Sequence, residues 1–146
     1  MKALIQRVSA ASVTVEGQVV GEIEQGILAY IGLGPEDSLD TAKKMIDKIL
    51  TYRIFDNEAG KLDKNVQQVE GGLLLVSQFT LMAKTDKGRR PDFGGAMAPA
   101  AASALFEQLV DYAKQQYLKV ETGKFAAEML VKADNDGPLN FILEIN

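Results

Sequence analysis

The chain of 146 residues contains no histidine and no cysteine. Without histidine there is no imidazole to act as a general base or a metal ligand. Without cysteine there is no thiolate nucleophile, no disulfide framework and no zinc site of the Cys/His type. Any reaction must therefore be carried out by hydroxyls, amides, backbone groups or the substrate itself.

Long apolar runs are also lacking, since none approaches the roughly 18 residues of a membrane helix. We therefore expect a soluble, untargeted protein without a membrane partner. The absence of cysteine fits the reducing cytoplasm. A net charge of −4 argues against broad, nonspecific nucleic-acid binding, although a local basic patch can still hold a phosphate backbone.

The length suits one ordinary domain spanning residues 1–146, and 47% hydrophobic residues are enough to build a core. Apolar patterns and turn residues predict strands over residues 2–8, 12–16, 18–23, 27–33, 65–69, 73–79, 128–133 and 139–145. The continuous apolarity of residues 27–33 indicates a strand covered on both faces, at the centre of a sheet.

Two segments have the apolar spacing of amphipathic helices. One runs from Leu39 to Leu50 after a capping residue, Asp37 or Ser38. The other begins at Pro99, a residue favoured in the first helical turn, after a long loop over residues 82–97. Together the elements predict an α+β fold with mixed β-sheets and both helices on one side.

The segment Ser77-Gln78-Phe79-Thr80 closes an apolar run with hydroxyls, an amide and an aromatic ring. At a strand end, backbone N–H groups can point at a carbonyl oxygen and stabilise the charge that develops in acyl transfer. The ordinary alternative is a core Phe79 with polar neighbours that satisfy the backbone. Thr80 as a nucleophile lacks the usual imidazole base.

Two further features have both an ordinary and a functional interpretation. Gly137-Pro138 is by spacing a trans turn between two strands, whereas a cis bond would aim its flanking carbonyls rigidly at a ligand. Arg7 is either a surface charge on an edge strand or a planar donor fork that clamps carbonyl groups.

The loop over residues 84–92 carries four cationic side chains against two acidic ones, including Lys87 and Arg90. It is either a phosphate-binding loop or solvated surface. Gly32-Leu33-Gly34 lacks the third glycine of a dinucleotide site, and Asp134-Asn135-Asp136-Gly137 lacks the register of a calcium loop. We therefore expect no cofactor and no metal.

Several ordered motifs from end to end of the chain resemble those of the D-aminoacyl-tRNA deacylases. They are Gln6-Arg7-Val8, Tyr52-Arg53-Ile54-Phe55, Asn65-Val66-Gln67-Gln68, Ser77-Gln78-Phe79-Thr80-Leu81, Gly88 with Arg90-Pro91, Thr122-Gly123-Lys124-Phe125-Ala126-Ala127, and Asn135-Asp136-Gly137-Pro138. The resemblance implies a homodimer of layered α/β/β subunits with active sites at the subunit interface. It also implies hydrolysis of the ester between a D-amino acid and the 3′-terminal adenosine of tRNA.

The resemblance further implies a chiral filter. In that family the Gly-Pro bond is cis and reaches into the partner subunit's pocket, and here Gly137 and Pro138 match it. Arg7 matches the arginine that holds the carbonyls of this motif. An L side chain would collide with the backbone of the motif, a D side chain would point away, and achiral glycine would not be excluded.

By the same resemblance, Phe79 and Thr80 supply backbone donors to the scissile carbonyl, with Gln78 nearby. Phe125 and Met129 match positions around the terminal adenosine. Either the Thr80 hydroxyl is the nucleophile, or the ribose 2′-hydroxyl assists water while the protein orients and polarises the ester. The missing histidine and cysteine favour the second mechanism.

The chain departs from the usual family pattern at Asp92, where serine is common, and at Leu139-Asn140, where valine and threonine are common. Two rival functions stay open. One is a catalytically silent tRNA-binding dimer, and the other is an editing deacylase that clears an L-amino acid. An editing enzyme of this kind resembles a domain attached to some threonyl-tRNA synthetases. The length of this chain, which suits a free-standing domain, and the presence of Gly137-Pro138 argue against it.

Overall fold

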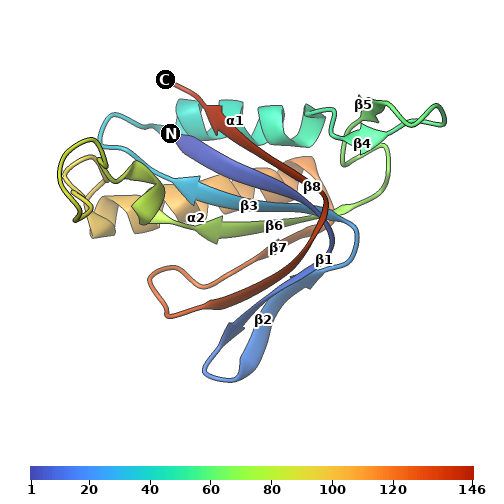
Figure 1. Ribbon diagram of the computed structural model, residues 1–146. Coiled ribbons are helices and arrows are strands. Elements are labelled where there is room, and N and C mark those ends of the chain that lie inside the picture. Colours follow the sequence, from blue (N-terminus) through green and yellow to red (C-terminus); the bar gives the residue numbers. More distant parts are fainter.

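The computed structural model describes all 146 residues and contains a six-stranded mixed sheet, a small two-stranded sheet and two long helices (Figure 1). The elements follow one another as β1 (Lys2–Val15), β2 (Gln18–Ile23), β3 (Gly26–Gly32), α1 (Leu39–Thr51), β4 (Phe55–Asp56), β5 (Leu62–Lys64), β6 (Gly72–Ser77), the 3₁₀ helix η1 (Phe79–Met82), α2 (Pro99–Gln116), β7 (Val120–Thr122) and β8 (Leu130–Glu144). No helix combines the length and the apolar character needed to span a membrane.

The long strand β1 organises the sheet because it pairs antiparallel with three partners. Its first half pairs with β3, its second half pairs with β2, and β8 follows it along nearly its whole length. The strands β3, β6 and β7 then continue the sheet in parallel, in the order β2-β1-β3-β6-β7. The strands β1 and β8 bend together, so that the sheet folds over on itself (Figure 1).

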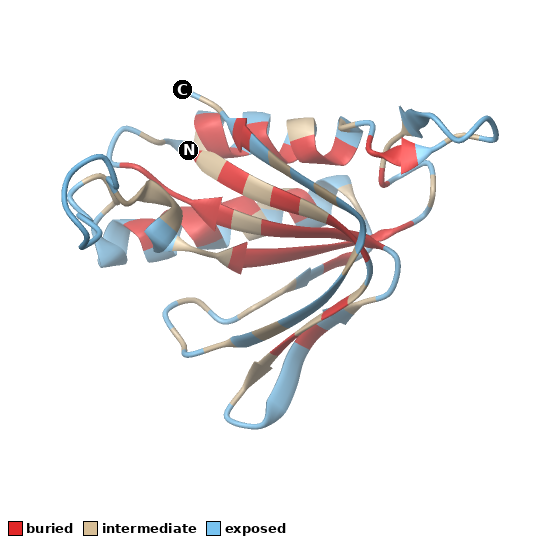
Figure 2. Ribbon diagram, in the orientation of Figure 1, coloured by how far each residue is buried: buried red, intermediate tan, exposed pale blue.

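This bend produces three layers. A core of 24 buried residues lies between the two helices and one face of the sheet. A second, smaller core lies on the opposite face, where the sheet curls over, and consists of Val8, Ala11, Val13, Leu28, Leu74 and Val76. Figure 2 shows β3 and β6 buried, whereas β8 is largely exposed. The predicted α/β/β layering, with both helices on one side, is confirmed.

The helices begin where the sequence predicted. Ser38 caps α1, since its hydroxyl accepts a hydrogen bond from the Thr41 backbone amide at 3.4 Å, and the Ser38 backbone amide donates to the Thr41 hydroxyl at 3.1 Å. Pro99 is the first residue of α2. The strand predicted at residues 27–33 is β3, and it lies between β1 and β6 at the centre of the sheet.

The strand boundaries at both ends of the chain were predicted wrongly. Residues 2–8 and 12–16 belong to the single strand β1, and residues 128–133 and 139–145 fall largely in the single strand β8. The physical reason is a pair of register shifts between these strands, near Arg7 and Asp136, which bend the ladder without ending it. The segment predicted as a turn at Gly137-Pro138 is therefore a bend within β8.

Other boundaries also differ from the prediction. Residues 65–69 form a turn instead of a strand, because the side chains of Asn65 and Gln68 each accept a hydrogen bond from the other residue's amide. The strand predicted to reach Phe79 ends at Ser77, where η1 takes over. The short strands β4, β5 and β7 were not predicted, since a segment of two or three residues is too short to show an alternating apolar pattern.

The close pairing of β3 with β6 leaves no room for a side chain at Gly26. A Cβ atom there would lie 2.0 Å from the Gly72 carbonyl oxygen and 2.6 Å from the Gly72 nitrogen, both of them backbone atoms. We expect Gly26→Ala to lower the free energy of unfolding by about 3 kcal/mol or more, as overpacking against backbone does. Urea denaturation monitored by circular dichroism measures this loss.

The control is Gly94→Ala, in an exposed loop where the closest atom to an added Cβ is a side-chain oxygen of Asp92 at 3.2 Å. We expect this variant to change stability by less than about 0.5 kcal/mol. Similar losses in the two variants would contradict the close approach of β3 and β6.

Candidate active site

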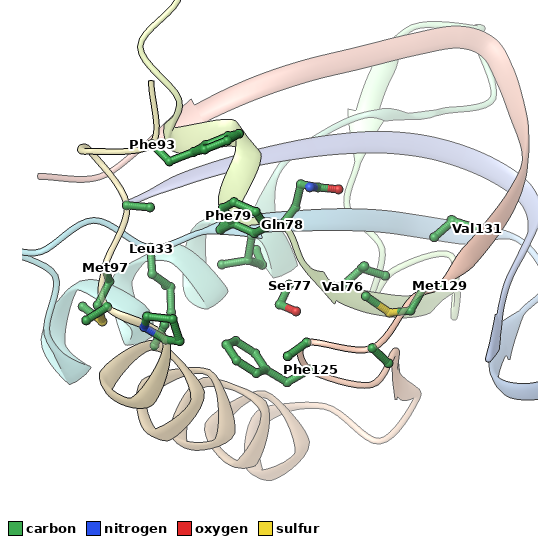
Figure 3. A pocket seen from close by; sticks show the side chains of 17 residues that line it. Leu33, Val76, Ser77, Gln78, Phe79, Phe93, Met97, Phe125, Met129 and Val131 are labelled. Atoms are coloured by element: carbon green, nitrogen blue, oxygen red, sulfur yellow. The ribbon is translucent and has the colours of Figure 1, made fainter. Parts of the chain in front are cut away.

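A pocket of about 610 Å³ opens where β3 and β6 end. Its walls come from the ends of these strands, the start of η1, the loop before α2, the first turn of α2 and the segment that enters β8 (Figure 3). The lining residues are Ile31, Leu33, Val76, Ser77, Gln78, Phe79, Phe93, Ala96, Met97, Ala98, Pro99, Ala102, Phe125, Ala126, Ala127, Met129 and Val131.

None of these lining residues has an ionisable side chain, and only Ser77 and Gln78 have polar ones. Tyr30 of β3, whose pKa is raised by burial, packs against the second core and does not line the pocket. The pocket therefore offers no side-chain general base. Its chemistry must come from apolar contact, from hydroxyl and amide groups, and from the backbone.

The backbone supplies donors at the start of η1. The first hydrogen bond of this helix runs from the Leu81 amide to the Gln78 carbonyl at 3.3 Å. The amides of Phe79 and Thr80 come before it, so they have no acceptor within the helix. The Gln78 side chain donates to the Thr80 hydroxyl. The predicted motif thus lies at a strand end with two unused amides.

Phe125 lies across the pocket from Phe79, and Met129 lines another part of it (Figure 3). The Phe125 ring is 6.0 Å from that of Phe106 in α2. A Cβ atom at Gly123 would lie 2.7 Å from the Met129 sulfur, so the absence of a side chain there lets Met129 occupy its place. The two residues that the resemblance assigns to the terminal adenosine therefore line the same pocket as Ser77 and Gln78.

Arg7 is buried, with 9% of its surface exposed, and β1 is an inner strand of the sheet. The interpretation of Arg7 as a surface charge on an edge strand is therefore wrong. Its Nε donates to the Asp136 carbonyl at 3.3 Å, and its Nη1 donates to the Ile54 carbonyl at 3.0 Å. The Asp56 and Asp136 carboxylates lie 3.5 and 3.3 Å from the same guanidinium.

The bend that follows Asp136 contains Gly137 and Pro138, and the peptide bond between them is cis. Gly137 has φ +121°, a conformation that favours glycine, and an added Cβ would lie 3.2 Å from Nη2 of Arg7. The Asn135 side chain donates to the Arg7 carbonyl at 3.0 Å and to the Leu139 carbonyl at 3.3 Å. The bend is therefore held from both sides.

The predicted site residues fall into three groups. Ser77, Gln78, Phe79, Phe125 and Met129 line the pocket together. Arg7, Gly137 and Pro138 lie together at the bend of β8 but are not among the residues that line the pocket of the same chain. Thr80 does not line the pocket, and Lys87 and Arg90 are exposed in the loop before Phe93.

Sequence reasoning missed Asn135 and the Ile54 carbonyl as supports of the bend. Asn135 was assigned to a turn between two strands, and asparagine is a common turn residue, so its presence there indicated no further role. The role of a backbone carbonyl leaves no trace in a sequence, so the motif Tyr52-Arg53-Ile54-Phe55 did not indicate that Ile54 supports the bend. No group of three or more acidic, histidine or cysteine side chains is arranged to hold a metal ion.

The family model described as D-Tyr-tRNA(Tyr) deacylase matches residues 4–144. The chain belongs to this deacylase family. Among curated deacylase sequences, a D-aminoacyl-tRNA deacylase of Psychrobacter sp. (strain PRwf-1) is 82% identical over 146 residues and covers 100% of both chains. A D-aminoacyl-tRNA deacylase of Acinetobacter baumannii (strain ACICU) is 60% identical over 145 residues and covers 99% of both chains. The predicted family is confirmed.

Two solved structures resemble this deacylase chain. One, described as c-Myc DNA Unwinding Element Binding Protein, is 38% identical with a TM-score of 0.96 and covers 100% of this chain and 99% of that one. The other, described as a probable eukaryotic D-amino acid tRNA deacylase, is 17% identical with a TM-score of 0.85, covering 99% and 98% of the two chains. The second likeness shows a shared fold.

We expect Arg7→Met to lower the free energy of unfolding by about 2–3 kcal/mol, because it leaves the carbonyls of Ile54 and Asp136 without their donor. The matched control is Arg53→Met, since Arg53 is 69% exposed and pairs with Asp63 at 3.2 Å. An exposed pair of this kind contributes less than about 1 kcal/mol. Urea denaturation measures both, and equal losses would contradict a special role for Arg7.

Proposed function

We propose that this chain hydrolyses the ester bond of D-aminoacyl-tRNA and releases free tRNA and the amino acid. The observation that carries the proposal is the pocket. In a chain of the D-Tyr-tRNA(Tyr) deacylase family, its apolar walls adjoin the start of η1, where two amides have no acceptor within their helix, that of the lining residue Phe79 and that of the next residue, Thr80. Such a site can orient and polarise an ester without an acidic or basic side chain.

The chemistry follows from these groups. A water oxygen attacks the ester carbonyl carbon, and negative charge develops on the carbonyl oxygen. The amides of Phe79 and Thr80 stabilise this charge, as oxyanion donors do. The bond to the 3′-oxygen of the ribose then breaks, that oxygen takes up one proton of the attacking water, and the other proton passes to solvent as the amino acid leaves as its carboxylate. The ribose 2′-hydroxyl assists the water, because the residues that line the pocket supply no base.

Phe125 and Met129 bind the terminal adenosine in this proposal. Both line the pocket, Phe125 across from Phe79 and Met129 to one side (Figure 3), and an apolar, aromatic wall suits the flat face of a purine. An adenosine held there places its ester toward Ser77 and Gln78, at the end of β6. Correct orientation is a large part of what an activated ester needs for hydrolysis.

We further propose that two chains form a homodimer through the side of β8. This strand pairs only with β1, so its other edge is free over up to 15 residues. Leu130 and Ile142 on it are 59% and 66% exposed. A long, exposed and partly apolar edge strand is a ready surface for another chain. Dimer formation would also explain why Gly137 and Pro138 lie outside the pocket of their own chain.

In the dimer, Gly137 and Pro138 of one chain act as the chiral filter of the other. The supports of the bend favour this role, since Arg7 holds the Asp136 carbonyl and Asn135 holds the Leu139 carbonyl. Backbone fixed in this way cannot retreat from an L side chain. Rejection by rigid backbone does not depend on the identity of the D side chain, so the filter accepts many D-amino acids and also glycine.

The loop before Phe93 contacts tRNA phosphates through Lys87 and Arg90. Both side chains are exposed, and neither pairs with a carboxylate. Free cations of this kind suit a phosphate backbone. Since the substrate is aminoacyl-tRNA, we place the activity in the cytoplasm.

The decisive experiment compares the hydrolysis of D-tyrosyl-, L-tyrosyl- and glycyl-tRNA by the purified chain. We expect rapid loss of the D-tyrosyl and glycyl esters, with the L-tyrosyl ester spared by at least about 100-fold, since a backbone clash exceeds the 1–3 kcal/mol of a missing methylene. Release of radiolabelled amino acid measures each rate.

Each other outcome has a definite meaning. Binding of tRNA without hydrolysis would leave a silent tRNA-binding dimer. Hydrolysis of the L ester would leave an editing enzyme or a filter altered near Leu139 and Asn140. Sparing of the glycyl ester would contradict rejection by backbone alone, because glycine has no side chain to collide.

We expect Thr80→Ala to keep the turnover of D-tyrosyl-tRNA within about tenfold of the unmodified chain, because its hydroxyl accepts a hydrogen bond from Gln78 outside the pocket lining. Loss of a true nucleophile costs on the order of 10⁴-fold or more in kcat. Single-turnover kinetics measure the difference. Complete loss of turnover in a folded variant that still binds tRNA would make Thr80 the nucleophile.

A further inference from the structure

Two aromatic side chains stand at the mouth of the pocket with much of their surface in water. Phe79 is 57% exposed and Phe93 is 43% exposed, and both line the pocket. Their ring centroids are 5.2 Å apart and their planes meet at 60° (Figure 3). Large exposed aromatic surface is costly in water, and a cluster of it marks a surface that another molecule covers.

The cationic loop leads directly to this pair. It carries Lys84, Lys87, Arg89 and Arg90, all exposed, and none of them lies within 4.0 Å of a carboxylate. The loop is closed at its base by backbone hydrogen bonds between Lys84 and Asp92, at 2.8 and 3.1 Å. Phe93 follows at once in the chain, so the loop, whose four cationic side chains outnumber its acidic ones, Asp86 and Asp92, leads directly into the aromatic pair.

Positive charge beside exposed aromatic rings is the composition that binds single-stranded nucleic acid. Phosphates are attracted by the cations, and bases stack on the rings. A protein partner would be expected to meet a cationic surface with acidic side chains. A nucleic-acid strand brings both of the required features in every nucleotide.

We propose that the Phe79–Phe93 pair stacks an unpaired base of the tRNA end, next to the terminal adenosine, while the loop holds the phosphates of this segment. The inference rests on the proposed function, which places the terminal adenosine at Phe125 and Met129. The strand then leaves the pocket across the aromatic pair toward the loop. Stacking tolerates any base, so this contact binds the end without reading its sequence.

Phe93 is the residue to change, because the proposed function uses the backbone of Phe79 and gives Phe93 no role beyond its place in the apolar wall. Phe93→Leu keeps an apolar side chain and removes the aromatic face, and Phe93→Tyr keeps the face. Leu118→Ala serves as the control for a general loss of exposed apolar surface, since Leu118 is 92% exposed and does not line the pocket.

The experiment measures kcat and KM for two substrates, D-tyrosyl-tRNA and D-tyrosyl-adenosine, which has no further nucleotides. For Phe93→Leu we expect kcat/KM on D-tyrosyl-tRNA to fall by about 5- to 100-fold, mainly through KM, as loss of one stacked base implies. The fall on D-tyrosyl-adenosine should be at least fivefold smaller. Phe93→Tyr should restore the value, and Leu118→Ala should behave as the unmodified chain.

Three results would overturn the inference. Equal losses on both substrates would assign Phe93 to the wall around the adenosine. Full activity of Phe93→Leu on tRNA would show that no base stacks there. A changed oligomeric state of Phe93→Leu in size-exclusion chromatography would make the pair a protein contact. Failure of the proposed function is separate, because the unmodified chain would then hydrolyse neither substrate.

Discussion

The fold and the candidate site both depend on one buried guanidinium. Arg7 lies where the ladder between β1 and β8 shifts register, and it donates to the carbonyls of Ile54 and Asp136 through two different nitrogens. A buried arginine must have its donors satisfied, and its planar fork can join two backbone segments that no regular ladder connects. This contact stabilises the bend that divides the sheet into two layers. It also fixes the segment that leads into Gly137 and Pro138.

The pocket separates two tasks that many hydrolases give to the same side chains. Apolar walls bind the substrate and keep water out, and the backbone at the start of η1 supplies fixed hydrogen-bond donors. Donors in such surroundings act more strongly than in water, because the local dielectric is low and no reorganisation is needed. Fixed amides also require no tuning of a pKa. The composition of the chain, which lacks histidine and cysteine, is compatible with this division.

Prediction from the sequence was most successful where one residue determines a local geometry. Ser38 and Pro99 marked the helix starts, and the continuous apolar run of β3 marked the centre of the sheet. It failed where long-range contacts decide. The bend in β8 depends on Arg7, 129 positions earlier than Asp136, so local pattern gave a turn instead. Likewise, Phe125 and Met129 were found through family resemblance, because nothing in their own spacing indicates a binding wall.

The absence of ionisable side chains from the pocket has a consequence for the dependence of the reaction on acidity. In most enzymes the bell-shaped rate profile reports an acid and a base of the protein. Here neither limb can belong to a residue of the same chain that lines the pocket. The profile of the chemical step would instead belong to the substrate and the solvent, through the ammonium group of the amino acid and the supply of hydroxide. In such an enzyme, the pH dependence of the chemical step would follow the intrinsic reactivity of the ester.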